Sequence, residues 1–534
     1  MKKLSLLIII LHCVLCTMHS QTTLPHDVAN EFGNLLVYHN NRICPLQTLA
    51  RDYTIKLTGK TSYKDFSAEQ VLLGWFFYYD EWRNEPMIKI KGKDAQQTLG
   101  IEGKYASFND FTSPQGYKLT GTQGKNFSAA DEKYNLIMMN LTGSLLKIFP
   151  HNNAQCTTHN FCDKREQSSL LRLPSGAKIT TEGSNAQSKE TTNHDNCDLS
   201  IENCALINWF ALNDNLPADM SQAEWLFIRK SMNLVAEYIA HSQYNEAIDL
   251  IRKIRKYQET QLGTLAPSKT RITAERIYNH LNFNRPLAMV LMFIGILLFI
   301  VTIIKTKTPR WGWIILYITS LYLLFSILLR GYIAGHFPLS NGFETMQFLA
   351  LIVALLPFIN LLRKNTHTPS LLIPNSILIS GIALMVATMS ELNPRITLLM
   401  PVLQSPLLSI HVMMIMISYA LFALITLNAI VNLIKKDPNS QLPTLTFALF
   451  FLTAGIFIGA IWANVSWGRY WGWDPKEVWA LITMLIYSLP LHRASLKIFQ
   501  NPRFLNWYYI FAFLSVVITY FGVNFILGGL HSYA

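Results

Sequence analysis

Cysteine is scarce in this sequence and is confined to its first part. Only seven of the 534 residues are cysteines, and the last of them is Cys204. Cys13 and Cys16 stand in a C-x-x-C spacing inside an apolar stretch, without thioredoxin-like surroundings, so we expect no redox chemistry from them. The remaining cysteines are Cys44, Cys156, Cys162, Cys197 and Cys204. Residues 156 with 162, and 197 with 204, are candidates for local disulfides, but the odd count predicts no complete framework.

Other common functional signals are also absent. The sequence shows no internal repeat, and its first half contains no constellation of side chains typical of an active site. The net charge is +12 at pH 7. Nevertheless, no basic stretch interleaved with aromatic residues, of the kind that binds a phosphate backbone, occurs in that half. These absences argue against nucleic-acid binding and against catalysis by the first half.

Apolar runs divide the chain into two parts. Half of all residues are hydrophobic, and beyond about residue 284 they form runs of the roughly 20 residues that span a bilayer. Met1-Lys2-Lys3 and the apolar residues after it resemble a secretory signal. Because no clean small-x-small cleavage site follows, residues 1–20 are either a signal peptide or an anchor. We expect residues 21–284 to form an exported, periplasmic domain and residues 285–534 to form a transmembrane domain.

Eight spans are predicted in the second part. They cover residues 287–304, 312–330, 343–362, 370–389, 410–434, 443–465, 476–496 and 505–527. Clusters of Lys and Arg stand at alternate ends of these spans, at 305–310, 363–364, 435–436 and 493–503. The positive-inside rule makes all four clusters cytoplasmic. The exported domain and the C-terminus would then lie on the outer side of a bacterial inner membrane.

The predicted fold class is therefore an all-α polytopic membrane protein of about eight transmembrane helices, with an N-terminal mixed α/β exported domain. In that domain, residues 88–93 alternate like a strand, and residues 151–195 are poor in apolar residues and read as a long loop. Apolar residues recur with helical spacing over residues 225–239 and 247–254.

Aromatic residues gather in one outer loop near the C-terminus. Five of the twelve tryptophans lie between Trp462 and Trp479. Residues 467–477 read Trp-Gly-Arg-Tyr-Trp-Gly-Trp-Asp-Pro-Lys-Glu, and their Asp474, Pro475 and Glu477 have the order of an N-cap, a first and a third helical residue. The loop is either an interfacial anchor or a rigid platform for a flat apolar ligand. The platform residues would be Trp467, Tyr470, Trp471, Trp473 and Asp474.

Two histidines are expected on the same side as this loop. His411 stands at the outer mouth of the fifth span, and His531 follows the last span. Two neutral imidazoles beside an aromatic platform suit the axial positions of six-coordinate haem iron. The alternative is a structural role at a helix end.

Other ionisable residues of the membrane part are candidates for accessory roles. His492 lies in the inner half of the seventh span, where such a side chain usually faces a partner or a cavity; alternatively, it reaches the interface together with Arg493. On the outer side, His336 could contact a haem propionate. Arg469 and Lys476 could pair with the propionates, or they could form local salt bridges.

Three motifs, in this order along the chain, carry a resemblance to a known family. They are Leu-Leu-Ser-Ile-His-Val, which contains His411, the tryptophan loop at 462–479, and the terminal Gly-Leu-His-Ser-Tyr, which contains His531. Together they resemble the WWD domain and flanking external histidines of the CcsA (ResC) family, the system II cytochrome c biogenesis proteins. Residues 41–111 look more loosely like the exported part of the partner protein CcsB (ResB), as it occurs in fused versions.

The resemblance implies roles for these residues. His411 and His531 would be the axial ligands of haem iron at the tryptophan loop, and His492 would belong to a second haem site inside the membrane. A CcsB-like membrane protein would supply the second histidine of that inner site, because the N-terminal half contains no multi-span portion.

The resemblance also implies a function. The protein would deliver haem b to the outer face and attach it covalently to the CxxCH motif of apocytochrome c, within a CcsB/CcsA-type synthase that depends on a thiol-reducing pathway. Two alternatives remain: a haem exporter or chaperone subunit without ligation activity, and a b-type haem electron-transfer subunit. Such b-type subunits usually pair their histidines across the bilayer, whereas His411 and His531 are expected on one face.

Overall fold

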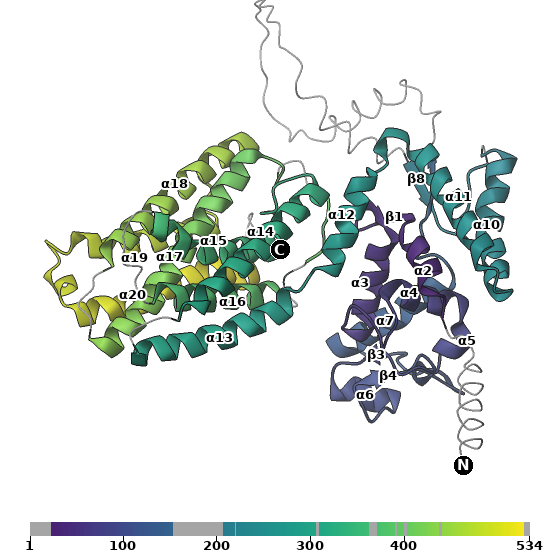
Figure 1. Ribbon diagram of the computed structural model, residues 1–534, viewed down its shortest axis with the longest axis horizontal. Coiled ribbons are helices and arrows are strands. Elements are labelled where there is room, and N and C mark those ends of the chain that lie inside the picture. Colours follow the sequence, from purple (N-terminus) through teal and green to yellow (C-terminus); the bar gives the residue numbers. More distant parts are fainter. Residues whose placement is uncertain are drawn as a thin grey trace, which may run out of the picture. The chain divides into compact units, whose positions relative to one another are not determined.

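The computed structural model describes residues 23–152, 207–218, 220–305, 309–362, 371–389, 392, 394–399, 403–436 and 441–527 (Figure 1). The chain separates into two compact units, with the division between Ile272 and Thr273. The predicted signal or anchor at residues 1–20 lies outside the described residues, as do four cysteines of the polar segment: Cys156, Cys162, Cys197 and Cys204.

The N-terminal unit is mainly helical, and its described strands form small two-stranded antiparallel sheets. The elements are α2 (His26–Gly33), β1 (Leu36–His39), β2 (Arg42–Pro45), α3 (Leu46–Thr58), α4 (Ala68–Phe77), α5 (Tyr79–Trp82), β3 (Ile88–Lys89), α6 (Lys93–Leu99), β4 (Tyr105–Ala106), β5 (Thr112–Ser113), β6 (Gly116–Tyr117), α7 (Lys125–Leu141), β7 (Phe149–Asn152), β8 (Ile207–Phe210), α10 (Gln222–Ala240) and α11 (Tyr244–Leu262). Helix α12 (Lys269–His280) follows.

Two sequence predictions for this unit can be compared with these elements. The helical spacing after residue 223 is confirmed by α10 and α11. The strand expected over residues 88–93 is shorter than predicted, because Gly92 has a φ of 88° and α6 starts at Lys93. A left-handed glycine turns the chain out of the extended conformation.

The core of the N-terminal unit combines aromatic packing with one buried polar bridge. Trp75 packs against Trp82 and Phe108, with ring centroids 6.1 and 5.8 Å apart. The Gln258 side chain of α11 is fully buried. It donates to the carbonyl oxygens of Leu36 (2.8 Å) and Ile148 (2.6 Å) and accepts from the Leu36 N–H (2.8 Å). One side chain thus satisfies buried backbone groups from two segments far apart in the sequence.

The C-terminal unit is a bundle of apolar helices (Figure 1). They are α13 (Asn284–Lys305), α14 (Trp311–Ala334), α15 (Gly342–Leu362), α16 (Leu372–Ala387), α17 (Pro406–Lys435), α18 (Leu442–Trp467), α19 (Pro475–Ser488), α20 (Pro502–Val517) and the π-helix η6 (Ile518–Leu527), which continues α20. Among the described residues, six helices are long and apolar enough to cross a membrane; α16 is a shorter apolar helix. The chain is therefore a multi-pass membrane protein. Each of the eight predicted spans overlaps a described helix, but α16 and α19 are shorter than the six helices that qualify as spans.

The seventh predicted span needs a correction. It was expected to continue to residue 496, but α19 ends at Ser488 and a short 3-10 helix, η4 (Leu489–His492), follows. Pro490 lacks a backbone N–H and so interrupts the α-helical hydrogen bonds at this point. Residues beyond η4 turn into a second 3-10 helix, η5 (Lys497–Gln500), before α20 begins.

Glycines let neighbouring helices approach closely. A Cβ on Gly295 of α13 would lie 2.7 Å from the Leu378 Cα of α16, and a Cβ on Gly381 of α16 would lie 2.7 Å from the Met292 nitrogen of α13. Small residues at a membrane helix interface allow backbone contact of this kind. Glycines also allow close approach between α17 and α18, where they position a candidate functional side chain.

Candidate functional site

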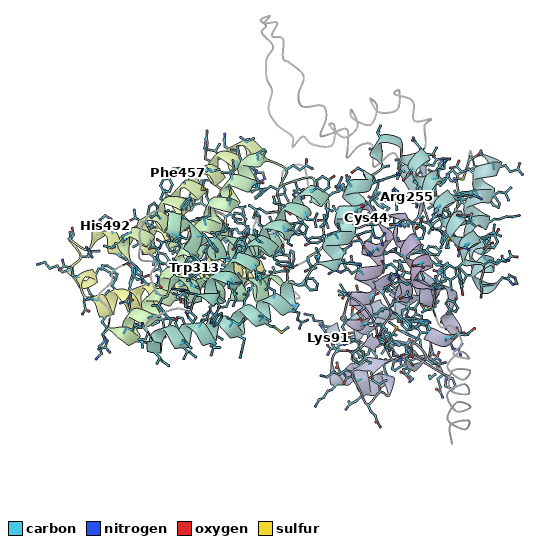
Figure 2. All side chains as sticks on the ribbon, in the orientation of Figure 1. Cys44, Lys91, Arg255, Trp313, Phe457 and His492 are labelled. Carbon is cyan, nitrogen blue, oxygen red and sulfur yellow. The ribbon has the colours of Figure 1, made fainter. Side chains whose placement is uncertain are left out.

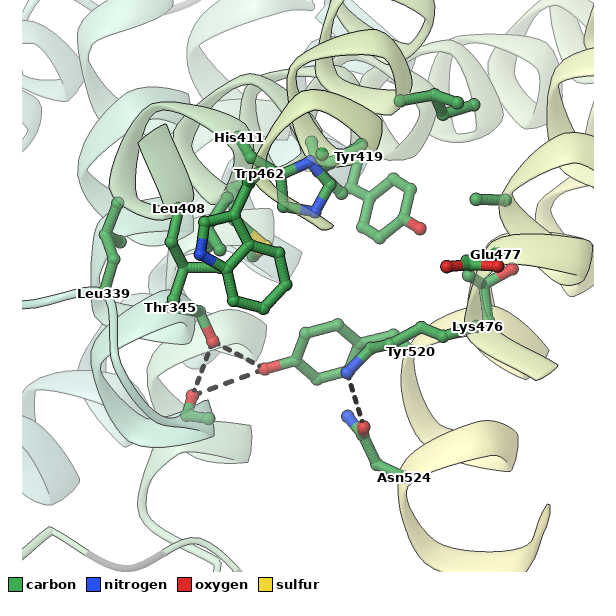
Figure 3. A pocket seen from close by; sticks show the side chains of 18 of the residues that line it. Leu339, Thr345, Leu408, His411, Tyr419, Trp462, Lys476, Glu477, Tyr520 and Asn524 are labelled. Atoms are coloured by element: carbon green, nitrogen blue, oxygen red, sulfur yellow. Dashed lines mark hydrogen bonds between the residues drawn. The ribbon is translucent and has the colours of Figure 1, made fainter. Parts of the chain in front are cut away.

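A cavity of about 210 Å³ lies in the bundle, and residues 339–341 and the tryptophan loop both contribute to its lining (Figure 3). The start of α15, the first half of α17, the second half of α18, the start of α19 and both turns of η6 contribute to its wall. The lining includes Leu339, Thr345, Leu408, His411, Met416, Tyr419, Trp462, Tyr470, Trp471, Lys476, Glu477, Thr519, Tyr520, Asn524 and Phe525. Apolar and aromatic side chains with a few polar ones are typical of a ligand-binding cavity.

His411 is held against α18 in a defined orientation. Its Nδ1 lies 2.7 Å from the carbonyl oxygen of Gly455. Because a carbonyl can only accept, Nδ1 carries the proton and Nε2 carries the lone pair that could bind a metal. A Cβ on Gly459 would lie 2.6 Å from the ring atoms Cε1 and Nδ1 of His411. Gly455 and Gly459 thus form a groove on α18 in which the imidazole rests.

The tryptophan loop is fixed at both ends. Gly468 ends α18 in the left-handed conformation, with a φ of 72°. At the other end, Asp474 and Glu477 form a capping box, as the sequence predicts, and Pro475 occupies the first turn of α19. Glu477 Oε2 accepts hydrogen bonds from the Gly472 N–H (2.8 Å) and the Asp474 N–H (3.3 Å).

Between these two hydrogen bonds, Trp473 is forced into an unusual backbone conformation. Its φ of 56° is left-handed, which is an outlier for a bulky residue and requires support from the surrounding structure. The side chain is 75% exposed and packs edge-on against Trp471, with centroids 6.1 Å apart. The backbone of the loop therefore directs Trp473 away from the cavity.

The predicted platform residues do not all line the cavity. Tyr470 and Trp471 line the cavity. Trp467 does not line it, but packs edge-on against Trp462 with centroids 4.9 Å apart. Asp474 is buried as the N-cap of α19. The cavity instead contains Trp462, a fully buried residue of α18. Figure 3 shows its indole beside His411.

Polar side chains face His411 from the opposite wall (Figure 3). Lys476 Nζ donates to Asn524 Oδ1 at 2.8 Å. Tyr520 shares a hydrogen bond of 2.8 Å with the hydroxyl of Thr345. Of the other predicted accessory residues, Arg469 is exposed with its guanidinium over Gly472. His336 is half-buried, and its Nδ1 lies 3.1 Å from the carbonyl oxygen of Phe337. Neither residue lines the cavity.

A buried ion pair anchors the start of α15. Arg330 of α14 is fully buried, and its Nε donates to Glu344 Oε1 at 2.7 Å. Its other nitrogens donate to the hydroxyl of Tyr278 and to two backbone carbonyls, at residues 394 and 395. Glu344 Oε2 accepts from the Ser340 N–H (2.8 Å) and hydroxyl (2.7 Å). This network fixes the 340–345 segment that lines the cavity.

Of the two remaining predicted histidines, the structure describes only His492, which does not line the cavity. His492 is exposed at the end of η4, which follows the end of α19 that is away from the tryptophan loop (Figure 2). His531 lies outside the described residues. Among the described residues, no group of three or more His, Cys, Asp or Glu side chains could hold a metal ion by itself.

Sequence reasoning missed several cavity residues. Gly455 and Gly459 have the small-xxx-small spacing of closely packed membrane helices, and that spacing places them opposite His411. Trp462 was noted only as one end of the aromatic cluster. Tyr520 and Asn524 belong to a predicted span, and no pattern in the sequence marks them as cavity residues.

Comparisons with known proteins agree with this part of the structure. Residues 339–531 match the family model described as Cytochrome C assembly protein. CcsA of Chlamydomonas reinhardtii, a cytochrome c biogenesis protein, is 35% identical over 267 residues, which cover 45% of this chain and 72% of that protein. CcsA of Trachelium caeruleum is 31% identical over 313 residues, covering 49% of this chain and 96% of that protein.

A longer relative matches both units. NrfI of Wolinella succinogenes is 30% identical over 556 residues, which cover 95% of this chain but only 55% of NrfI. The chain thus spans about half the length of that relative. These matches show that the chain belongs to the CcsA family of system II cytochrome c biogenesis proteins, with a CcsB-like N-terminal region.

Proposed function

We propose that the chain binds haem b in the cavity beside His411 and attaches it to the CxxCH motif of apocytochrome c, as part of a CcsB/CcsA-type synthase. Membership of the family implies haem handling. The observation that carries the more specific proposal is the geometry of His411. The Gly455 carbonyl fixes its tautomer at 2.7 Å, so that Nε2 is the nitrogen suited to iron, and a partner that fixes the other ring nitrogen is typical of metal-binding histidines.

The chemistry of the other lining residues is suited to haem. Trp462 and Trp471 supply flat apolar walls next to the imidazole. Lys476, on the facing wall, supplies a cation, and a lysine can pair with a propionate carboxylate. His531 would be the second axial ligand. An apocytochrome histidine would replace one of the two axial imidazoles as the haem is transferred.

Attachment would need positioning more than acid–base catalysis. Each cysteine sulfur bonds to the inner carbon of a vinyl group, and the thiol hydrogen ends on the outer carbon. The addition therefore consumes no oxidant or reductant, but both cysteines must arrive as thiols, which a thiol-reducing pathway would ensure. Orienting two bound reactants can lower a barrier by about 7–11 kcal/mol.

We assign His492 to the entry of haem from the inner side. Its side chain is exposed at the end of η4, so a histidine of a CcsB-like membrane protein could approach it. In this arrangement the exported N-terminal domain and the C-terminus lie on the periplasmic side of a bacterial inner membrane. The complete pathway then needs the partner as well as this chain.

The experiment is maturation of a c-type cytochrome in cells that contain the chain and a CcsB-like partner. We expect His411→Ala to abolish covalent haem attachment while the protein level in the membrane is unchanged. His280→Ala is the control, because it removes an exposed histidine of α12 that does not line the cavity. Normal maturation with His411→Ala would overturn the proposal. Haem bound by the parent chain without any thioether product would favour a haem exporter or chaperone instead.

A second pair of variants tests the aromatic wall. Trp471 lines the cavity, whereas Trp473 does not. We expect Trp471→Ala to lower the haem content of the purified protein much more than Trp473→Ala, because only the first removes a surface that haem would contact. Equal effects of the two substitutions would mean that the loop acts as a unit, independently of the cavity geometry.

A further inference from the structure

The last helix of the bundle changes its hydrogen-bond register where it reaches the cavity. Helix α20 is α-helical over Pro502–Val517 and π-helical over the ten residues Ile518–Leu527. A π-helix, with i→i+5 bonds, is rare, is mostly limited to a single turn, and is frequent at functional sites. A π segment of this length therefore requires a physical reason.

The spacing of the cavity-lining residues in this segment matches that of a π-helix. Thr519 and Asn524 both line the cavity, and so do Tyr520 and Phe525. The members of each pair are five residues apart. In an α-helix with 3.6 residues per turn, residues five apart point about 140° away from each other. Only the π register can place both members of both pairs on the cavity wall.

Side chains of two neighbouring helices hold this register. The Thr519 hydroxyl donates to the Ser515 carbonyl of α20 at 2.7 Å, and it lies 3.1 Å from the Thr483 hydroxyl and 3.3 Å from the Trp479 carbonyl in α19. Tyr520 bonds Thr345 of α15 at 2.8 Å, and Asn524 accepts from Lys476 of α19 at 2.8 Å.

These contacts would not survive a change of register. A rotation of residues 519–525 into an α-helix would keep at most one member of each pair in place. The π register is thus selected by tertiary contacts, each of which is a single hydrogen bond of modest net strength. Gly522, in the middle of the segment, has no side chain to oppose such a rotation.

We propose that the π register of residues 518–527 assembles the ligand-facing wall of the cavity, and that a slip of this segment into the α register releases the ligand. The identity of the ligand, haem, rests on the proposed function. A ligand shifts such an equilibrium only by its differential affinity for the two states. Haem in contact with Tyr520, Asn524 and Phe525 would bind the π state preferentially. Once the haem is joined to the cytochrome, loss of these contacts would free the product.

Cysteine labelling distinguishes the two registers without haem. Phe525 is 45% exposed and lines the cavity, whereas Val523 is 1% exposed. An α register would turn residue 523 toward the cavity, close to the direction of residue 519, and would turn residue 525 away. In the π register, Phe525→Cys reacts with a methanethiosulfonate reagent at least tenfold faster than Val523→Cys. Labelling of the unsubstituted chain gives the background, which is subtracted from both. The reverse order overturns the proposal.

A second experiment tests the slip and its link to release. Tyr520→Phe combined with Asn524→Leu removes the hydrogen bonds to α15 and to Lys476. We expect reactivity to move from position 525 to position 523 and transfer of bound haem to an excess of apoglobin to become at least tenfold faster. An unchanged labelling order, or an unchanged transfer rate, contradicts the proposal.

The two proposals fail in different ways. Labelling of positions 523 and 525 in the absence of haem reports the register whatever the ligand is. If His411→Ala still matures cytochrome c normally, the proposed function fails and the register result stands. If His411→Ala stops maturation but the labelling order is reversed, only the register proposal fails.

Discussion

The contact between Gly459 and His411 gives the most specific prediction for the cavity. In Gly459→Ala, the new Cβ would lie 2.6 Å from Cε1 and Nδ1 of the imidazole, whereas ordinary contact begins at 3.4 Å. Since the helix backbone is fixed by its own hydrogen bonds, the His411 ring must move by about 0.8 Å, the difference between these distances.

The effect of this displacement on haem binding follows from the hydrogen bond that it lengthens. Moving the ring by that amount along the 2.7 Å bond from Nδ1 to the Gly455 carbonyl would lengthen it to at most about 3.5 Å, beyond the usual hydrogen-bond range. A net loss of about 0.5–1.5 kcal/mol follows for the bond, and about 1.4 kcal/mol corresponds to a tenfold change in affinity. A misplacement of about 1 Å can also lower a reaction rate by about 100-fold.

The assay is haem titration of the purified membrane protein, followed by the absorption of the bound haem. We expect Gly459→Ala to weaken haem binding about tenfold and to lower cytochrome maturation further. The matched control is Gly455→Ala, one helical turn away. Its carbonyl can still accept from His411, but its new Cβ would meet Ile415 of α17, at 2.7 Å from Cδ1 and 3.3 Å from the backbone nitrogen, instead of the imidazole.

A wild-type titration curve for Gly459→Ala would refute this reasoning, because it would show that haem binding does not depend on the position of the His411 ring. Equal weakening by both alanine substitutions would also refute it. In that case, helix spacing, and not the imidazole, would determine the affinity.

Three further predictions concern the supports of the fold. Glu477→Ala removes the acceptor of two loop N–H groups and weakens the cap of α19 by about 1 kcal/mol, so trypsin should cleave at Arg469 faster than in the parent chain. Glu344→Gln leaves the buried Arg330 without a counter-charge and should destabilise the membrane unit by about 3–5 kcal/mol. The unfolding temperature in detergent should fall accordingly. Replacing both residues by apolar ones should restore much of the lost stability. Gln258→Leu removes the side-chain partner of buried backbone groups, which costs about 1–3 kcal/mol for each group. Proteolysis of the N-terminal unit should therefore accelerate. An unchanged rate of proteolysis would contradict the role of the Gln258 bridge.

The features that sequence reasoning found are those with local causes. The cap of α19 depends on Asp474, Pro475 and Glu477, which are neighbours in the chain, and the structure forms it as predicted. The spans were located from runs of apolar residues, which any membrane-crossing helix requires. The early end of α19 also has a local cause, Pro490, which stands two residues after Ser488.

The features that sequence reasoning missed depend on packing between distant segments. Which tryptophan faces the cavity is decided by the rotation of α18, which buries Trp462, and by the left-handed backbone that turns Trp473 outward. Tyr520 and Asn524 reach the cavity through a π register, which the 3.6-residue periodicity used to interpret helices does not represent.

The most direct test of the central claim is the reduced absorption spectrum of the purified chain and of His411→Ala, each produced with a CcsB-like partner. The account predicts bands of a bis-histidine haem in the parent chain, and their loss or conversion to a weakly ligated form in the variant. If His411→Ala retains the same amount of haem with the same spectrum, His411 is not an axial ligand and the cavity beside it is not the haem site.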